Sequence, residues 1–136
     1  PQKDVHGIRF MQRDIMVFDS SLHNYCDSIS CLHALEHFGL GRYGDDVDPD
    51  GHIKGMHNMV NMLKKGGTLY LSVPIGLTQR IEFDCHRVFN KQTLFRLFKQ
   101  FNLEIGLRHY VDEHGDITAS FPDCHLGCGI FELIKR

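Results

Sequence analysis

The chain has 136 residues, among them 15 Lys and Arg against 17 Asp and Glu, with a formal net charge of −2. This charge gives no basic surface for a nucleic acid partner, and no apolar run approaches the roughly 20 residues that span a bilayer. The length fits one domain, residues 1–136. The odd number of cysteines, five, lacks the spacing of a small disulfide scaffold. We therefore expect free thiols and a cytoplasmic location.

The first part of the chain predicts two strands and a long loop. Residues 8–15 (IRFMQRDI) form a short apolar segment with a polar exit, which favours a strand. Residues 25–35 (YCDSISCLHAL) predict a buried strand that turns into a loop or a short helix. Residues 38–50 contain three glycines, one proline and four aspartates, a composition typical of a loop.

A helix is predicted after this loop. Asp48 suits the N-cap and Pro49 suits the first helical position, where its missing N–H is harmless. Apolar residues then recur at helical spacing. The lysines at 64–65 suit the C-terminal end of the helix, and the glycines at 66–67 favour its left-handed stop. Residues 68–74 follow as a predicted strand.

The last third repeats the helix and strand pattern. Asn90 predicts the N-cap of a helix whose apolar face extends to Phe101. Residues 103–110 predict a strand, 112–116 a turn, and 129–136 a final strand antiparallel to its neighbour. Strands that alternate with helices predict an α/β fold with a Rossmann-like, mostly parallel sheet and a reversed C-terminal edge.

Several segments resemble class I S-adenosylmethionine-dependent methyltransferases. YCDSISCLHALEH resembles the fourth strand and the turn after it, NMLKKGGTLYLSVP the fifth strand with the preceding helix end, and FNKQTLFRLFKQFNLEI the next helix and the sixth strand. RFMQRDI resembles the third strand. The string EHFGLGRYGDDVDPDGH, followed by IEFDCHRVF, resembles more particularly a methyltransferase-like domain of unknown function, number 268 in that series.

The resemblance implies a sheet with strand order 3-2-1-4-5-7-6. The first two strands of that order, with the Gly-x-Gly-x-Gly turn and the ribose-binding acid, have no counterpart in the 136 residues. Residues 8–15 would then be the third strand, on the far side of a two-strand gap. We therefore expect a domain that is incomplete at its N-terminal edge.

S-adenosylmethionine is the cofactor that the resemblance implies, bound at the carboxyl ends of the strands. Asp14 would accept a hydrogen bond from the adenine amino group, and Ile15 would flank the ring. Cys31, Leu32 and His33 would line the methionine part. A structural interpretation is equally open for two of them, with Asp14 capping a turn and His33 a satisfied core residue.

Methyl transfer requires an acceptor held in line and, for a hydroxyl or amine, a base that takes its proton. Glu36 and His37 are the predicted base and its orienting partner, and His86 is a further candidate that could reach the same cleft. We expect a small-molecule or glycan-linked acceptor. The residues leave the oligomeric state open.

Three residues are candidates for binding that acceptor. Arg42 and Tyr43 lie in the glycine-rich loop, which could act as a lid or as a rigid loop. Arg87 could bind an anionic acceptor. The structural alternative for Arg87 is an ion pair with Glu82 or Asp84 that holds the loop.

Two other functions compete with methyl transfer. His33, Glu36 and His37 have the H-x-x-E-H order of a zinc hydrolase, but this motif needs a long helix, and the glycines after residue 38 end any helix there. The cysteines and histidine of residues 124–128 lack a second pair, so no metal site is predicted. The remaining alternative is a methyltransferase fold that binds a ligand or partner without catalysis.

Overall fold

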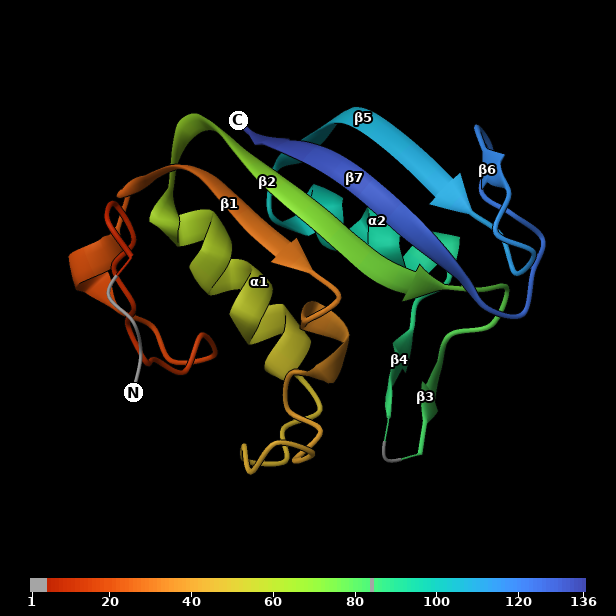
Figure 1. Ribbon diagram of the computed structural model, residues 1–136, viewed down its shortest axis with the longest axis horizontal. Coiled ribbons are helices and arrows are strands. Elements are labelled where there is room, and N and C mark those ends of the chain that lie inside the picture. Colours follow the sequence, from red (N-terminus) through yellow and green to blue (C-terminus); the bar gives the residue numbers. More distant parts are fainter. Residues whose placement is uncertain (1–4, 84) are drawn as a thin grey trace.

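The computed structural model describes residues 5–83 and 85–136 of the chain. The described residues form a five-stranded sheet, a separate two-stranded hairpin, two α-helices and two short 3-10 helices (Figure 1). In chain order the elements are η1 (Ser20–Leu22), β1 (Cys26–Leu32), η2 (Leu35–His37), α1 (Gly51–Met62), β2 (Leu63–Ile75), β3 (Arg80–Glu82), β4 (His86–Val88), α2 (Lys91–Gln100), β5 (Leu103–Val111), β6 (Ile117–Thr118) and β7 (Gly127–Lys135).

The strand order of the main sheet is β1-β2-β7-β5-β6. β1 is parallel to β2, and β7 is antiparallel to both β2 and β5. β1, β2 and β5 therefore run in one direction, with β7 reversed between them. This confirms the α/β, Rossmann-like fold and the strand order 4-5-7-6 that the resemblance implies. The reversed strand lies inside the sheet, however, and the edge position is taken by β6.

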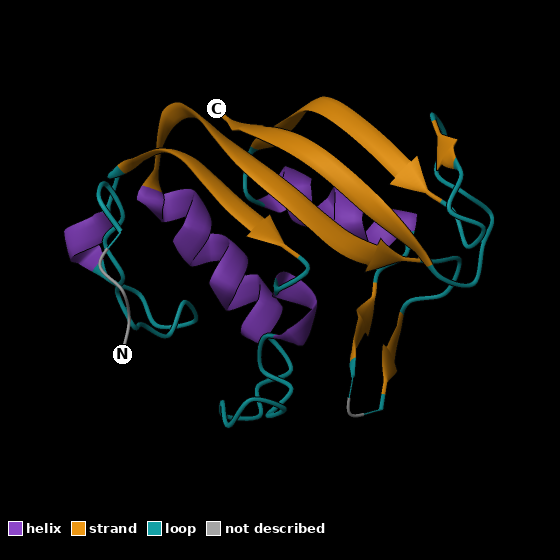
Figure 2. Cartoon of the chain, viewed as in Figure 1, coloured by secondary structure: helices purple, strands orange, loops and turns teal. Residues whose placement is uncertain are grey.

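Both helices pack on the same face of the sheet (Figure 2). Leu69, Leu71 and Val73 alternate along β2 and are fully buried against the helices, in one hydrophobic cluster with side chains such as Met56 and Leu94. Burial of this apolar surface is the main source of stability for the layer. The opposite face of the sheet exposes large apolar side chains, namely those of Leu32, Tyr70, Leu107 and Ile130.

Neither α1 nor α2 is long and apolar enough to cross a membrane, and the described residues contain no other α-helix.

The second helix begins as predicted, whereas the first begins later. Asn90 caps α2, because its side-chain oxygen accepts a hydrogen bond from the Thr93 N–H at 2.8 Å. In α1 the N-cap is Asp50. Asp48 instead accepts from the Asp50 N–H at 2.9 Å and pairs with Lys54, so it forms a turn ahead of the helix.

The end of α1 also differs from the prediction. The helix stops at Met62, and the lysines at 64–65 lie in the first part of β2. Gly66 has the expected left-handed φ of +78°. This glycine turn of β2 lies opposite the point in β1, between Cys26 and Ser28, where the strand pairing shifts register. The glycines therefore mark an irregularity within a strand rather than a helix stop.

The strand predicted for residues 8–15 is wrong. The segment is irregular, and Ile8 is 70% exposed. A strand needs a partner for its backbone N–H and C=O groups, and no strand of the described residues pairs with this segment. The segment is attached to α1 instead, since the Asn58 side-chain amide donates to the Ile15 carbonyl at 2.8 Å.

The structure adds a hairpin that the sequence patterns did not indicate. β3 and β4 pair antiparallel, with Ile81 opposite Arg87, and the hairpin extends away from the end of β2 (Figure 1). A salt bridge of 2.6 Å joins Arg80 and Glu82 along β3. The hairpin brings His86 and Arg87 toward the carboxyl end of β1.

The loop between η2 and α1 closes tightly on itself. The Asp48 N–H donates to the Gly39 carbonyl at 2.9 Å. Gly39 has a φ of +72°, and a Cβ added there would lie 2.1 Å from the Asp48 carbonyl oxygen. Only glycine allows this approach, which fixes the loop beside the start of α1.

We expect Gly39→Ala to lower the free energy of unfolding by at least about 2 kcal/mol more than Gly44→Ala. Both glycines have positive φ, so both substitutions strain the backbone, but a Cβ at Gly44 meets no atom within 4 Å. Urea titration of both variants measures the difference. Equal destabilisation would show that the approach of Gly39 to Asp48 has no energetic importance.

Candidate functional site

The carboxyl end of β1 turns sharply at His33. This residue has a φ of +49°, and its N–H donates to the Ser72 carbonyl at 3.0 Å. The chain then enters the single 3-10 turn of η2. The H-x-x-E-H order therefore spans the end of a strand and a tight turn, as the strand-to-turn interpretation predicts, and not a helix that presents two imidazoles to one metal.

A pocket of about 370 Å³ lies at this end of the sheet. It brings together five residues that the sequence analysis selected, namely Asp14, Ile15, His33, His37 and Tyr43. The sequence analysis missed other lining residues, which are Arg13, Met16, Ala34, Phe38 and Asp45. Apart from the acidic composition of the loop around Asp45, no sequence signal indicates this second set.

Asp14 both lines the pocket and caps a turn. Its carboxylate accepts a hydrogen bond from the Met16 N–H at 2.8 Å, which is the structural role considered for it. Arg13, the preceding residue, pairs with Asp19. Although residues 8–15 form no strand, these contacts and the bond from Asn58 place Asp14 and Ile15 at the pocket wall.

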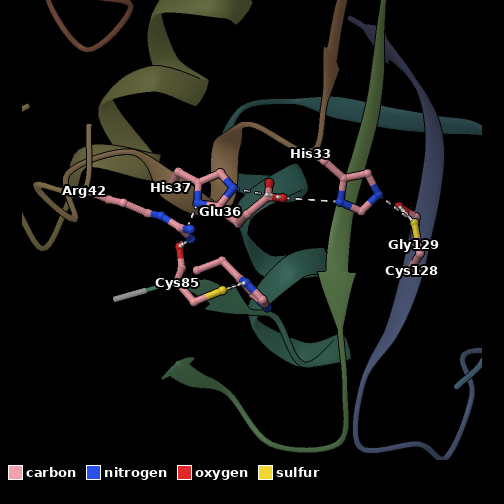
Figure 3. A network of polar contacts seen from close by, with 8 residues as sticks. His33, Glu36, His37, Arg42, Cys85, Cys128 and Gly129 are labelled. Atoms are coloured by element: carbon pink, nitrogen blue, oxygen red, sulfur yellow. Dashed lines mark hydrogen bonds and ion pairs between the residues drawn. The ribbon is translucent and has the colours of Figure 1, made fainter. Parts of the chain in front are cut away.

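Glu36 lies between two imidazoles (Figure 3). Its Oε1 atom is 3.3 Å from His33 Nδ1 and 3.9 Å from His37 Nε2. The side chain is 2% exposed, and Oε2 has no hydrogen-bond partner among the described residues. An isolated buried carboxylate is costly. The carboxylate is therefore open to a further hydrogen-bond donor, such as a cationic ligand.

His37 and His86 are linked through Cys85. His37 Nδ1 lies 2.8 Å from the Cys85 carbonyl oxygen, and the Cys85 thiol lies 2.7 Å from His86 Nδ1. The two rings are 6.2 Å apart. Burial lowers the pKa of His86, while the charge of Glu36 acts to raise it. His86 is thus a neighbour of His37 but does not line the pocket.

Arg42 and Tyr43 close over His37 from the loop. The Arg42 guanidinium donates to the Cys85 carbonyl at 3.2 Å and lies over the Tyr43 ring, 5.6 Å from its centroid. The Tyr43 ring meets His37 edge to face at 5.5 Å. Tyr43 therefore lines the pocket, whereas Arg42 connects the loop to the hairpin.

The loop adds a negative charge to the pocket at Asp45. Its carboxylate accepts hydrogen bonds from the N–H groups of Gly39, Gly41 and Tyr43 at 3.0 to 3.3 Å. Although burial acts to raise the pKa of Asp45, the backbone hydrogen bonds lower it overall. The pocket wall is therefore acidic at neutral pH.

Two of the predicted cofactor-binding residues lie elsewhere. Cys31 is buried in the hydrophobic core, where desolvation raises its pKa to about 11. Leu32 is 58% exposed on the open face of the sheet. Successive side chains of a strand point to opposite faces, so one lies in the core and the other on the open face. The first residue of this segment that lines the pocket is His33.

Arg87, a predicted residue for binding the acceptor, is buried and does not line the pocket. Arg87 is 2% exposed, and its guanidinium donates to the carbonyls of Phe38 at 2.5 Å and Pro49 at 3.3 Å. Burial lowers its pKa. Arg87 therefore has a structural role. Its partners are backbone carbonyls rather than the carboxylates that the structural alternative predicts. Glu82 pairs with Arg80 instead, and Asp84 lies outside the described residues.

The described residues give no support to a zinc hydrolase. No group of three or more His, Cys, Asp or Glu side chains in residues 5–83 and 85–136 is placed to hold a metal ion. All five cysteines are free thiols. The polar groups near the strand end instead form a chain of imidazole, carboxylate and thiol contacts (Figure 3).

A protein-family model described as Caenorhabditis protein of unknown function, DUF268, matches residues 8–120. The chain belongs to this family. The matched range of this chain includes the glycine-rich loop and the hairpin segment, so the resemblance to domain family 268 is confirmed. No curated protein matches the chain significantly.

Solved structures show a class I methyltransferase-like fold. The [4+2]-cyclase SpnF superposes with a TM-score of 0.64 at 12% identity over 96% of this chain, and this chain spans 56% of its length. A putative methyltransferase from Bacillus halodurans gives a TM-score of 0.62 at 13% identity, covering 94% of this chain and 78% of that one.

A S-adenosylmethionine-dependent methyltransferase from Thermotoga maritima, titled a possible histamine N-methyltransferase, gives a TM-score of 0.52 at 12% identity, covering 84% of this chain and 58% of that one. At these identities the likeness concerns the fold alone. The DUF268 chain thus has the fold of a methyltransferase and spans little more than half of two of these three proteins.

We expect Arg87→Met to lower the free energy of unfolding by about 3 kcal/mol, because buried carbonyls lose a charged donor. Arg96→Met, at an exposed position of α2, is the control and should change it by no more than about 0.5 kcal/mol. Denaturant unfolding measures both. Similar small effects in the two variants would contradict a structural role for Arg87.

The pH dependence of stability should carry a contribution from His52. This side chain packs near Phe89, with ring centroids 5.9 Å apart, and its Nδ1 is buried without a partner among the described residues. Burial, and next the charge of Arg87, lower its pKa to about 4 from 6.5. Between these values the unfolded chain binds a proton that the folded chain does not.

Stability should therefore fall as the pH is lowered from 6.5 to 4. His52→Gln should reduce the loss in that window, whereas His114→Gln, at an exposed turn position, should leave it unchanged. Unfolding midpoints measured across the window check this. The same slope in His52→Gln as in the parent chain would rule out the contribution.

Proposed function

We propose that this DUF268 chain is a S-adenosylmethionine-dependent methyltransferase whose acceptor is a hydroxyl or amine on a small or glycan-linked molecule. The observation that carries the proposal is the pocket at the carboxyl end of β1. It joins Asp14, Ile15 and His33, which the methyltransferase resemblance selects, to His37, a predicted member of the catalytic pair. In α/β sheets this end of the strands is where ligands bind.

The residues present fit the cofactor. S-adenosylmethionine carries a cationic sulfonium, an ammonium and an adenine ring. The pocket offers carboxylates at Asp14 and Asp45 and an apolar wall that includes Ile15 and Phe38. Glu36 adds a buried oxygen that has no partner among the described residues. Asp14 would accept from the adenine amino group, with Ile15 against the ring and His33 and Glu36 beside the methionine part.

When bound, the cofactor supplies an electrophilic methyl carbon on a sulfonium that leaves readily. The residues of the chain then have to hold the acceptor and take its proton. His37 is suited to this because Nδ1 faces the Cys85 carbonyl, which only accepts hydrogen bonds and so fixes the proton on Nδ1. The lone pair of the neutral ring is therefore on Nε2.

Glu36 supports the same proton transfer. Its Oε1 lies 3.9 Å from His37 Nε2, the atom that would receive the acceptor proton. A buried carboxylate at this distance gives the transferred proton a negatively charged neighbour. Tyr43, packed edge to face on His37, would limit access of water to the pair.

A methyltransferase fold that binds a ligand without methyl transfer is the second candidate. Two observations favour it. The 136 residues contain no counterpart of the Gly-x-Gly-x-Gly turn, and one of the three similar structures is titled a [4+2]-cyclase rather than a methyltransferase. The fold is therefore compatible with more than one chemistry.

Calorimetric titration of the chain with S-adenosylhomocysteine tests the proposal. We expect saturable binding, and Asp14→Asn should weaken it about tenfold, because the loss of one hydrogen-bonded charge costs about 1.4 kcal/mol. Asparagine keeps the oxygen that accepts from Met16, so the turn should survive. Asp27→Asn is the control, since Asp27 pairs with Lys64 away from the pocket.

Absence of binding heat at millimolar ligand, with a folded chain, would overturn the methyltransferase proposal and favour the non-catalytic alternative. Equal weakening in Asp14→Asn and Asp27→Asn would place the ligand outside this pocket.

A further inference from the structure

Cys128 lies on the side of His33 away from Glu36 and His37 (Figure 3). It is half-buried at the start of β7, opposite Pro74 of β2. Its Sγ atom is 3.3 Å from His33 Nε2. Strands β1 and β7 are separated by β2, so the contact crosses the carboxyl end of the sheet.

The other nitrogen of the same ring faces Glu36. His33 Nδ1 lies 3.3 Å from Glu36 Oε1. The carboxylate only accepts hydrogen bonds, so it fixes the ring proton on Nδ1. Nε2 is then an acceptor, and the thiol of Cys128 is the group that donates to it. A nucleophile, a base and an acidic residue that orients the base are therefore in contact in one line.

Two further features distinguish this row of three residues from a chance surface contact. Glu36 is 2% exposed, and its second oxygen has no partner among the described residues. His33 is held at a φ of +49°, a region that non-glycine residues rarely adopt. Backbone strain of this kind is concentrated at functional sites.

We propose that Cys128, His33 and Glu36 form a second site, in which the Cys128 thiol accepts an acyl group from a thioester or an activated ester. Cys128 is the nucleophile, His33 the base, and Glu36 a positioning residue. An acyl donor suits this arrangement because its leaving group needs a proton, which His33 can return after taking it from the thiol.

Acyl transfer to the thiol requires neither an oxidant nor a metal. The S–H proton moves to His33 Nε2 as sulfur bonds to the carbonyl carbon. The bond from that carbon to the leaving sulfur or oxygen then breaks, and the leaving group takes the proton from Nε2. Burial, and then the charge of Glu36, raise the pKa of Cys128. The thiol is therefore neutral at rest, and its reaction depends on the base.

The neighbouring Cys85 and His86 form a simpler pair. Their Sγ and Nδ1 atoms are 2.7 Å apart, but His86 Nε2 has no hydrogen-bond partner among residues 5–83 and 85–136. Among the described residues, no carboxylate contacts this ring in the way that Glu36 contacts His33. Cys85 is therefore a suitable comparison for Cys128 in the same molecule.

Acetylation by 4-nitrophenyl acetate tests the proposal. The rate of acetylation is measured from the release of 4-nitrophenolate, and mass spectrometry of peptides locates the acetyl group. We expect Cys128 to be acetylated first, ahead of Cys85 and of the half-buried Cys26. Cys128→Ser should abolish the fast phase. Acetylation of Cys85 or Cys26 before Cys128 would overturn the proposal.

His33→Asn removes the base and keeps the fold. Asparagine tolerates the left-handed conformation but cannot take the proton at neutral pH. We expect the Cys128 rate to fall about 100-fold relative to Cys26 in the same sample. A change of less than about twofold in that ratio would contradict general-base assistance by His33. The assay contains no methyl donor, so its result is independent of the methyltransferase proposal.

Glu36→Gln tests the positioning residue. Glutamine keeps the size of the side chain and removes its charge, and we expect the ratio to fall about tenfold. Glu36→Asp, which keeps a carboxylate on a shorter side chain, should restore part of the lost rate. Equal losses in Glu36→Asp and Glu36→Gln would contradict a positioning role for the carboxylate.

Discussion

The guanidinium of Arg87 supports most of the geometry described for the strand end. It is buried and donates to carbonyls at the end of η2 and just before α1, two segments that no strand pairing connects. Carbonyl groups in such turns need donors once they leave water. Because Arg87 belongs to β4, these bonds also fix the β3–β4 hairpin against the loop. His37 and Cys85 therefore meet at a defined distance.

The regular elements were accessible from sequence because their signals are local. Asn90 is a side-chain cap, the apolar spacing that follows it is helical, and Gly66 adopts the left-handed turn. These features depend on residues within a few positions of one another. The failed strand at residues 8–15 shows the opposite case. Its apolar residues suit a strand, but strand formation depends on a partner elsewhere in the chain.

The residues of the candidate site show the same contrast between local signals and contacts with distant parts of the chain. Asp14 and His33, predicted from the resemblance, and His37, predicted from the need for a base, lie at the pocket. Cys31 and Leu32 are predicted to line the cofactor site but do not line the pocket. Sequence position at a strand end does not tell on which face of the sheet a side chain emerges. The contact between His33 and Cys128 joins residues 95 positions apart, and no spacing pattern indicates it.

Glu36 contacts His33 on one side and His37 on the other, through the same oxygen. A ligand that draws the Glu36 carboxylate toward one ring therefore withdraws it from the other. If both proposed chemistries take place, the shared carboxylate couples them through a single atom.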